Sequence, residues 1–404
     1  MKKMLLCGMT AMLAVTTMAQ EKEAVEEGFQ FTTVDSIAIS PIKNQKNAGT
    51  CWCYSGLSFL ESEVYKKTGK MYDFSEMYVV EKTYMDRAEK AVRTHGDVSF
   101  SQGGSAGDLF YAMRHFGLVP ESEMRPGVMY GDTLSNHSEL SALTNPMVAA
   151  AAKARKLQFA PDGEPLWKKS VQAVHEIYLG KCPEKFTFEG KEYTPMSFYK
   201  MTGLNADDYV NIGSFTHHPY SMGEYKGVGF AIEVQDNWRW GECTNVELDD
   251  MMQIIDDAVA NGYTVLWGGD VSEEGFTRNG IAVYPDMEAA DVPGLDQAHW
   301  LKLDRTAKNN EISKRPLPQK VVTPAERQRG YDNFETTDDH GMHLFGTAKD
   351  QQGNRYYMIK NSWGISGKYN GIWYMTPEFT RAKVLNIVVN KNAISKALRA
   401  KYGI

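Results

Sequence analysis

The clearest helical pattern in the chain begins at Cys51, where apolar residues recur at i, i+4, i+7 and i+11 from position 53. This spacing places them on one face of an α-helix. Two lysines after position 65 suit the carbonyl end of that helix, and Gly69 suits its stop. We expect Cys51 in the first turn and Glu61 and Glu63 on a solvated face. The predicted buried stripe consists of Cys53, Leu57, Leu60 and Val64.

Other segments show helical or strand patterns. Residues 140–180 and 246–262 have helical patterns, and residues 101–120 form a glycine-containing loop that runs into a helix. Residues 262–271 are predicted to be a buried strand with a glycine break.

A β-hairpin is predicted near the C-terminal end of the chain, with strands over 340–348 and 355–360 and a turn over 350–353. A turn centred in this loop pairs the start of the first strand with the residues just after the second. We therefore expect Asn361 beside His340.

Residues 1–19 have the pattern of a secretory signal peptide. Two lysines precede an apolar run of about 16 residues, which ends in the small-x-small pattern Thr17-Met18-Ala19. We expect cleavage after Ala19 and an exported protein, periplasmic or secreted. No later stretch reaches about 18 consecutive apolar residues, so no membrane span is expected in the mature chain.

Composition excludes some classes of protein. The 404 residues are 42% hydrophobic and 24% charged, which fits one large globular domain or two smaller ones. The net charge of −7 argues against nucleic-acid binding, because phosphate contacts need a basic face.

Few cysteines remain after the expected signal peptide, too few for a disulfide scaffold. Cys51 and Cys53 are separated by one residue, and a bond between them would be strained. A bond between Cys182 and Cys243 is left open by the sequence.

Cys51 has the surroundings of a catalytic thiol. A helix N-terminus and a neighbouring imidazolium both lower the pKa of a thiol. His340 is the candidate for that imidazole, and Asn361 is the candidate that holds its ring. The backbone N–H of Cys51 and the side-chain amide of Gln45 are candidate donors to a developing oxyanion. Trp363 is expected to shield the Asn–His contact from water.

Three motifs, QKNAGTCWCYS, DDHGMH and IKNSWG, resemble those of the papain superfamily of cysteine peptidases. The resemblance implies an α+β, papain-like two-lobe fold, with the cysteine on a helical left lobe and the histidine and asparagine on a β-rich right lobe. It also implies that Gly103 and Gly104 bind the substrate backbone. The family's oxyanion glutamine, cysteine, histidine, asparagine and following tryptophan fall on Gln45, Cys51, His340, Asn361 and Trp363.

Two departures from papain indicate the bleomycin hydrolase or aminopeptidase C branch. Ala48 stands where papain has a disulfide cysteine, three positions before the nucleophile. The distance from Cys51 to His340 is about twice the roughly 130 to 150 residues of papain-like enzymes, which predicts a large insertion. Further matches to this branch are YTPMSFYKMTGLNADDYVNI, SFTHHPY and NGYTVLWGGDVSEEGF.

The expected organisation has four parts. They are the signal peptide at 1–19, a lead-in and left lobe at 20–135, an inserted, mostly helical region at 136–290, and a right lobe with a short C-terminal tail at 291–404. The resemblance implies hydrolysis of peptide substrates, mainly from the N-terminus, without a metal or other cofactor. It also implies a homo-oligomer, a hexamer with active sites facing an inner channel.

Two alternatives stay open within and beyond this fold. The branch has an extended C-terminal arm whose carboxylate meets the free amine of the substrate, and the tail ending at Ile404 does not match it. Either this tail still reaches the cleft, or the lead-in at 20–40 fills that place, or the cleft is open and the enzyme is an endopeptidase. A catalytically inactive binding protein and a thiol enzyme of acyl transfer are the more distant alternatives.

Other histidines are predicted to be structural. His340 and His343 point to opposite faces of a strand, so they cannot chelate one metal ion together with the CxC pair. His217 and His218 are expected to be structural or to lie on the rim of the site.

Overall fold

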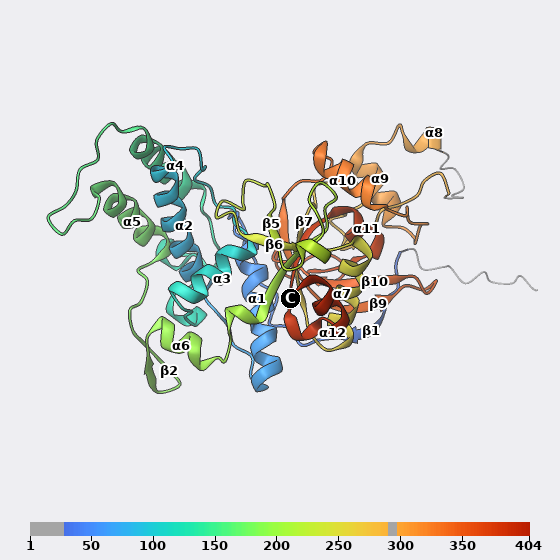
Figure 1. The fold of residues 1–404 in the computed structure, drawn as a ribbon, viewed down its shortest axis with the longest axis horizontal. Helices are drawn as coiled ribbons and strands as arrows, with labels where there is room; N and C mark the ends of the chain where they lie inside the picture. Colours follow the sequence, from blue (N-terminus) through green and yellow to red (C-terminus); the bar gives the residue numbers. More distant parts are fainter. Residues whose placement is uncertain (1–27, 290–296) are drawn as a thin grey trace, which may run out of the picture.

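The computed structural model describes residues 28–289 and 297–404. The expected signal peptide at 1–19 lies outside these residues. Figure 1 shows a helical lobe and a sheet-rich lobe side by side, with α1 (Cys51–Thr68) between them. The α+β, two-lobe fold predicted from the sequence is therefore confirmed.

The helical lobe packs around one face of α1. Ser75 caps the next helix by accepting a hydrogen bond from the backbone N–H of Tyr78, and Ser105 and Asp108 form a capping box on the helix after it. A small hairpin of β2 (Phe186–Phe188) and β3 (Lys191–Tyr193) completes the lobe. Its other helices are α2 (Glu76–Arg93), α3 (Ala106–His115), α4 (Ser138–Lys153), α5 (Leu166–Leu179) and α6 (Pro195–Met201).

The described residues of the other lobe form a ten-stranded sheet, in the order β5-β6-β4-β12-β7-β9-β10-β11-β8, with β1 also paired to β9. Two neighbouring pairs, β4–β6 and β8–β11, are parallel, and the others are antiparallel. The strands are β1 (Thr32–Ser36), β4 (Tyr209–Gly213), β5 (Gly229–Ala231), β6 (Glu242–Asn245), β7 (Val265–Gly269), β8 (Ile281–Ala282), β9 (His340–Lys349), β10 (Arg355–Lys360), β11 (Ile372–Met375) and β12 (Val384–Asn390).

Helices cover this sheet, and a core forms between them where Trp267, Met342 and Ile387 are fully buried. The helices of this lobe are α7 (Leu248–Ala260), α8 (Gln297–Trp300), α9 (Arg305–Ile312), α10 (Pro324–Asp332), α11 (Pro377–Lys383) and α12 (Lys396–Tyr402). Short 3-10 segments lie at η1 (Glu121–Glu123), η2 (Val128–Tyr130), η3 (Ala206–Asp208), η4 (Gly223–Tyr225) and η5 (Lys391–Ala393). None of the helices within 28–289 and 297–404 is both long enough and apolar enough to cross a membrane.

The helix predicted at Cys51 is confirmed, and one expectation about it is wrong. It begins at Cys51 and ends before Gly69, whose left-handed φ of 73° favours glycine, and its predicted stripe is fully buried. Glu61 and Glu63 are also buried, because α1 lies between the two lobes and has no solvated face at these positions. Glu61 accepts a hydrogen bond from the backbone N–H of Phe74 at 2.9 Å, and Glu63 accepts one from Asn390 at 2.7 Å.

The region expected to be one helical insertion at 136–290 is divided in the structure. Its first part forms α4 to α6, whereas from Tyr209 onward the chain enters the large sheet. β7 lies between β12 and β9 near the middle of that sheet. The β-rich lobe therefore needs strands from before residue 290, which sequence order alone does not reveal. Cys182 lies in the helical lobe and Cys243 in β6, and both are free thiols.

Candidate active site

The candidate site forms where the first turn of α1 meets the start of β9. Cys51 is the first residue of the helix, and His340 is the first residue of the strand. The strand comes close to the helix because residue 341 is glycine: a Cβ there would lie 2.7 Å from Ser55 Oγ and 3.4 Å from Trp52 Cα. Both Cys51 and His340 line one cavity of about 590 Å³.

His340 is held by the second strand of the predicted hairpin. His340 and Asn361 approach each other at 2.8 Å between Nε2 and Oδ1, and the ring of Trp363 lies 4.9 Å from the imidazole ring. An amide oxygen only accepts hydrogen bonds, so Nε2 carries the hydrogen and Nδ1 is left as an acceptor. Asn361 is buried, and the hairpin expected to bring it beside His340 is present.

The two glycines expected to bind substrate backbone also line the cavity. A Cβ on Gly104 would lie 2.9 Å from the indole of Trp52, and one on Gly103 would overlap the carboxylate of Asp236. The carbonyl of Gly103 accepts a hydrogen bond from Arg87 Nη1 at 2.6 Å. Glycine at both positions is what leaves room at this wall.

Gln45 lies behind the cavity wall. Its Nε2 donates to the carbonyl of Ala48 at 2.7 Å, and its Oε1 accepts from the hydroxyl of Ser362 at 2.5 Å. It is not among the described residues that line the cavity. The oxyanion role expected for Gln45 therefore stays a prediction, and the contacts seen here fix the loop before α1.

Comparison with protein families now decides the family. The model of the Peptidase C1-like family matches residues 9–311 and 321–403. The chain belongs to this family. With it comes the assignment of this chain as a cysteine-type peptidase of the bleomycin hydrolase and aminopeptidase C branch, as its motifs predicted.

Several curated relatives match this peptidase over most of their length. Aminopeptidase G of Lactobacillus delbrueckii subsp. lactis is 24% identical over 393 residues, which cover 88% of this chain and 82% of the relative. Bleomycin hydrolase of Homo sapiens is 24% identical over 405 residues, which cover 89% of this chain and 82% of the relative. The solved structure of PepW from Lactobacillus rhamnosis HN001 has a TM-score of 0.65 at 19% identity, covering 91% of this chain and 84% of that one, and supports the papain-like fold.

Burial shifts the pKa values of both the Cys51 thiol and the His340 imidazole. Burial raises the pKa of the Cys51 thiol to about 11, against a lowering effect of the Gly341 backbone N–H, and the carboxylates of Asp338 and Asp236 raise it further. Burial lowers the pKa of the His340 imidazole to about 4. Burial therefore favours the pair of neutral thiol and neutral imidazole, and the ion pair expected from the sequence stays a prediction. This pair carries the same number of protons as the pair of thiolate and imidazolium.

A loop that the sequence analysis missed forms another wall of the cavity. Residues 232–241, which we call the strap, connect β5 to β6 and run from the sheet to the helical lobe (Figure 1). Arg239 of the strap pairs with Asp86 of α2 and with Asp108 of α3, each at 2.7 Å. Asp236 pairs with Arg87 of α2 at 3.2 Å. No local motif marks these residues, because their partners lie more than a hundred positions away.

The tail and the described part of the lead-in pack on the sheet-rich lobe. Ile404 packs against the core of the sheet-rich lobe, and its backbone N–H donates to the carbonyl of Arg399. β1 of the lead-in pairs with the far half of β9, where Thr32 lies opposite Lys349. Neither Ile404 nor any described residue of 28–40 lines the cavity. The choice among the three alternatives for the cleft therefore stays a prediction, and residues 20–27 of the lead-in lie outside the described residues.

The remaining histidines lie away from the thiol. His343 is fully buried and meets the hydroxyl of Ser58 at 2.8 Å, which confirms its structural role. His217 and His218 each lie 3.2 Å from the carboxylate of Glu233, which belongs to the strap. Among the described residues these three have the spacing of metal ligands.

Proposed function

We propose that this peptidase removes residues from the N-terminus of peptides, with Cys51 as nucleophile, His340 as general base and Asn361 as the residue that orients the imidazole. The observation that carries the proposal is the contact of 2.8 Å between His340 and Asn361 at a cavity that also exposes Cys51. The geometry matches the nucleophile, base and orienting group that acyl transfer requires.

The proposed reaction has two steps. In the first, the Cys51 sulfur attacks the carbonyl carbon of the scissile amide while His340 Nδ1 takes the thiol proton. The tetrahedral intermediate collapses to a thioester when the imidazolium returns that proton to the leaving amine. In the second, His340 takes a proton from water, the hydroxide attacks the thioester, and the proton returns to the Cys51 sulfur as the carboxylic acid leaves.

Two observations favour an aminopeptidase over an endopeptidase. The relatives that match this chain over most of their length include proteins named aminopeptidase G, E, W and C. The strap lines the cavity and is paired with α2 and α3 of the helical lobe, and in this proposal it closes one end of the cleft. Cutting inside a chain needs a cleft that is open at both ends.

The deciding experiment compares one peptide with a free and with an acetylated N-terminus, using the wild-type protein and Cys51→Ala. We expect stepwise release from the free peptide, little cleavage of the acetylated one, and no cleavage of either by Cys51→Ala. Internal products from the acetylated peptide would assign an endopeptidase instead. Binding of peptide without any cleavage would assign the inactive binding protein.

Export and assembly are part of the proposal and rest on the N-terminal pattern and on the family resemblance. We expect the mature protein to begin at Gln20 and to form a homo-oligomer, a hexamer in the resembled branch. Mass spectrometry of the mature N-terminus and light scattering in solution test these two points separately.

A further inference from the structure

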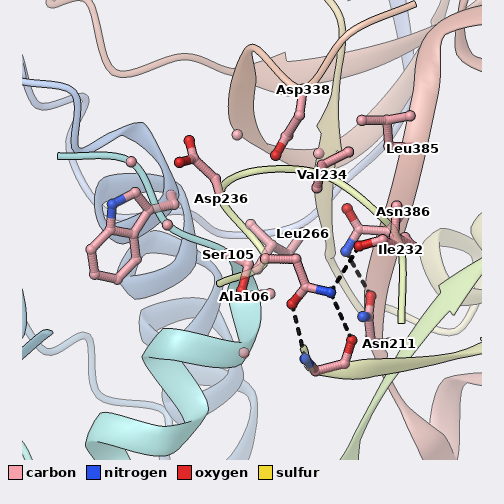
Figure 2. A pocket seen from close by; sticks show the side chains of 18 of the residues that line it. Ser105, Ala106, Asn211, Ile232, Val234, Asp236, Leu266, Asp338, Leu385 and Asn386 are labelled. Carbon is pink, nitrogen blue, oxygen red and sulfur yellow. Dashed lines mark hydrogen bonds between the residues drawn. The ribbon is translucent and has the colours of Figure 1, made fainter. Parts of the chain in front are cut away.

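Two carboxylates face the cavity from different segments of the chain. Asp236 belongs to the strap, and Asp338 lies just before β9. Figure 2 shows both at one side of the pocket, away from the hydrogen-bonded Asn211 and Asn386. Cys51 lines the same cavity, so a substrate bound at the thiol occupies the cavity that these two groups line.

The carboxylate of Asp338 can bind a cationic ligand. Its side chain is exposed to the cavity, and within the described parts of the chain it makes no hydrogen bond or ion pair. Its surroundings are acidic: burial, Asp236 and the neighbouring Asp339 raise the pKa of Asp338 to about 7. A cation placed here would relieve repulsion as well as form a charge-assisted hydrogen bond.

Asp236 is fixed in place by the helical lobe. Its Oδ1 accepts from Arg87, a fully buried side chain that also donates to the carbonyl of Gly103. The side chain of Asp236 is 30% exposed and lies directly against Gly103. The carboxylate is therefore held at the end of the glycine pair that is predicted to bind substrate backbone, where the strap crosses the cleft.

We propose that Asp338 and Asp236 form the subsite that binds the ammonium group at the N-terminus of the substrate. This inference rests on the proposed aminopeptidase function and names the residues that select a free amine. A fixed negative charge at a closed end of a cleft favours an ammonium and disfavours a continuing chain.

Binding of the ammonium also acts on the nucleophile. Asp338 and Asp236 oppose formation of the Cys51 thiolate through their charge. An ammonium between them cancels part of that charge, so a substrate with a free amine eases the proton transfer from Cys51 to His340. A substrate without the amine leaves the thiol in its less reactive state.

The test measures kcat and KM of wild type, Asp338→Asn and Asp236→Asn on aminoacyl-coumarin substrates with a free and with an acetylated amine. We expect Asp338→Asn to lower kcat/KM for the free-amine substrate by about 10- to 100-fold and not to lower it for the acetylated one, because loss of the Asp338 charge also removes its opposition to the Cys51 thiolate. Asp338→Glu keeps the charge and should retain most of the preference. Asp249→Asn removes an exposed carboxylate on α7 and serves as the matched control.

A third substrate, acetyl-lysyl-coumarin, separates the two sources of an ammonium group. If Asp338→Asn impairs only this substrate, the subsite binds a lysine side chain and the proposal for the N-terminus is overturned. The proposal is also overturned if Glu242→Gln, at another wall of the cavity, removes the free-amine preference while Asp338→Asn does not. In both cases cleavage that depends on Cys51 leaves the peptidase assignment intact, whereas loss of that dependence would refute the proposed function itself.

Discussion

The two lobes meet at two places, and α1 and β9 contribute to both. One place is an open cavity, and the other is a closely packed polar cluster. At the front, the start of α1 and the start of β9 border a cavity of about 590 Å³. Behind it, later turns of α1 and the paired strands β9 and β10 enclose a polar cluster with a gap of only about 10 Å³. The polar cluster consists of Ser40, Lys43, Ser58, Glu61, His343 and Lys360.

Charges in the polar cluster are satisfied by the protein itself. Lys360 Nζ donates to the carbonyl of Ser40 at 2.9 Å and to the hydroxyl of Ser58 at 2.8 Å, and Glu61 accepts from the hydroxyl of Ser40. In the cavity, by contrast, the carboxylate of Asp338 faces open space. The polar cluster joins the two lobes through charged groups whose hydrogen bonds are made within the protein, whereas the carboxylate of Asp338 is available to a ligand.

The largest effect is expected at Cys51. Cys51→Ala removes the proposed nucleophile and should lower kcat by about 10⁴-fold or more, with no change in the free energy of unfolding. Cys53→Ala is the matched control, because Cys53 is fully buried in the helical lobe. It should lower stability by about 1 kcal/mol and leave kcat/KM of the folded protein unchanged. The check is active-site titration together with thermal unfolding of both variants.

Asn361→Ala should have the next largest effect. Without Asn361 the imidazole of His340 loses the partner that sets its tautomer, so kcat should fall by about 100-fold while KM changes little. Asn354→Ala, in the turn of the same hairpin, is the control for the fold of the two strands. Equal losses in the two variants would mean that the hairpin, not the orientation of His340, is what matters.

Lys360→Met is expected to reverse this pattern, because it affects the polar cluster. It leaves the carbonyl of Ser40 and the hydroxyl of Ser58 without their donor and should lower the free energy of unfolding by about 1–3 kcal/mol. The kcat of the folded enzyme should stay within a few fold. Lys349→Met, at the exposed end of β9, should change neither quantity. Chemical denaturation and kinetics on the same samples separate the two effects.

Features that depend on local sequence could be predicted, whereas features that depend on contacts between the two lobes could not. The start of the helix at Cys51, the hairpin and the contact of His340 with Asn361 follow from local periodicity and turn spacing. Burial of Glu61 could not be predicted, because it depends on a second lobe packing over the helix. The strap escaped notice for the same reason: Arg239 and Asp236 are tied to the helical lobe by partners far away in the chain.

Asp338 lies in the motif DDHGMH, but the motif alone does not indicate a function for it, since a charged residue beside His340 is also typical of a solvent-exposed position. The structure indicates a function for Asp338 because the fold brings Asp236 of the strap to the same cavity. The sequence therefore predicts residues whose partners are close in the chain, whereas the structure is needed to find residues whose partners lie across the cleft.

The smallest predicted effect is on the pH dependence of kcat/KM, which distinguishes the ionisation of Asp338 from that of His340. The pKa of Asp338 is raised to about 7 by burial and by Asp236 and Asp339, so the carboxylate gains protons as pH falls through 7 and loses its attraction for an ammonium. Because kcat/KM reports groups of the free enzyme and the free substrate, protonation of Asp338 by itself should lower it about twofold from pH 8 to pH 7, and further below pH 7 until it reaches the level of Asp338→Asn. The limb due to His340, near pH 4, should remain in all variants.

This limb near pH 7 should appear with free-amine substrates and be absent with acetylated ones. It should also be absent in Asp338→Asn, whose side chain does not titrate, whereas Asp249→Asn should keep it. A limb near pH 7 that persists in Asp338→Asn would assign the titration to another group, with His340 the first candidate, and would mean that the imidazole is less shielded from water than its buried place beside Trp363 implies. The substrate's own α-amine, with a pKa of about 7.7–8.0, sets the upper limb and should vanish together with the lower one when the amine is acetylated.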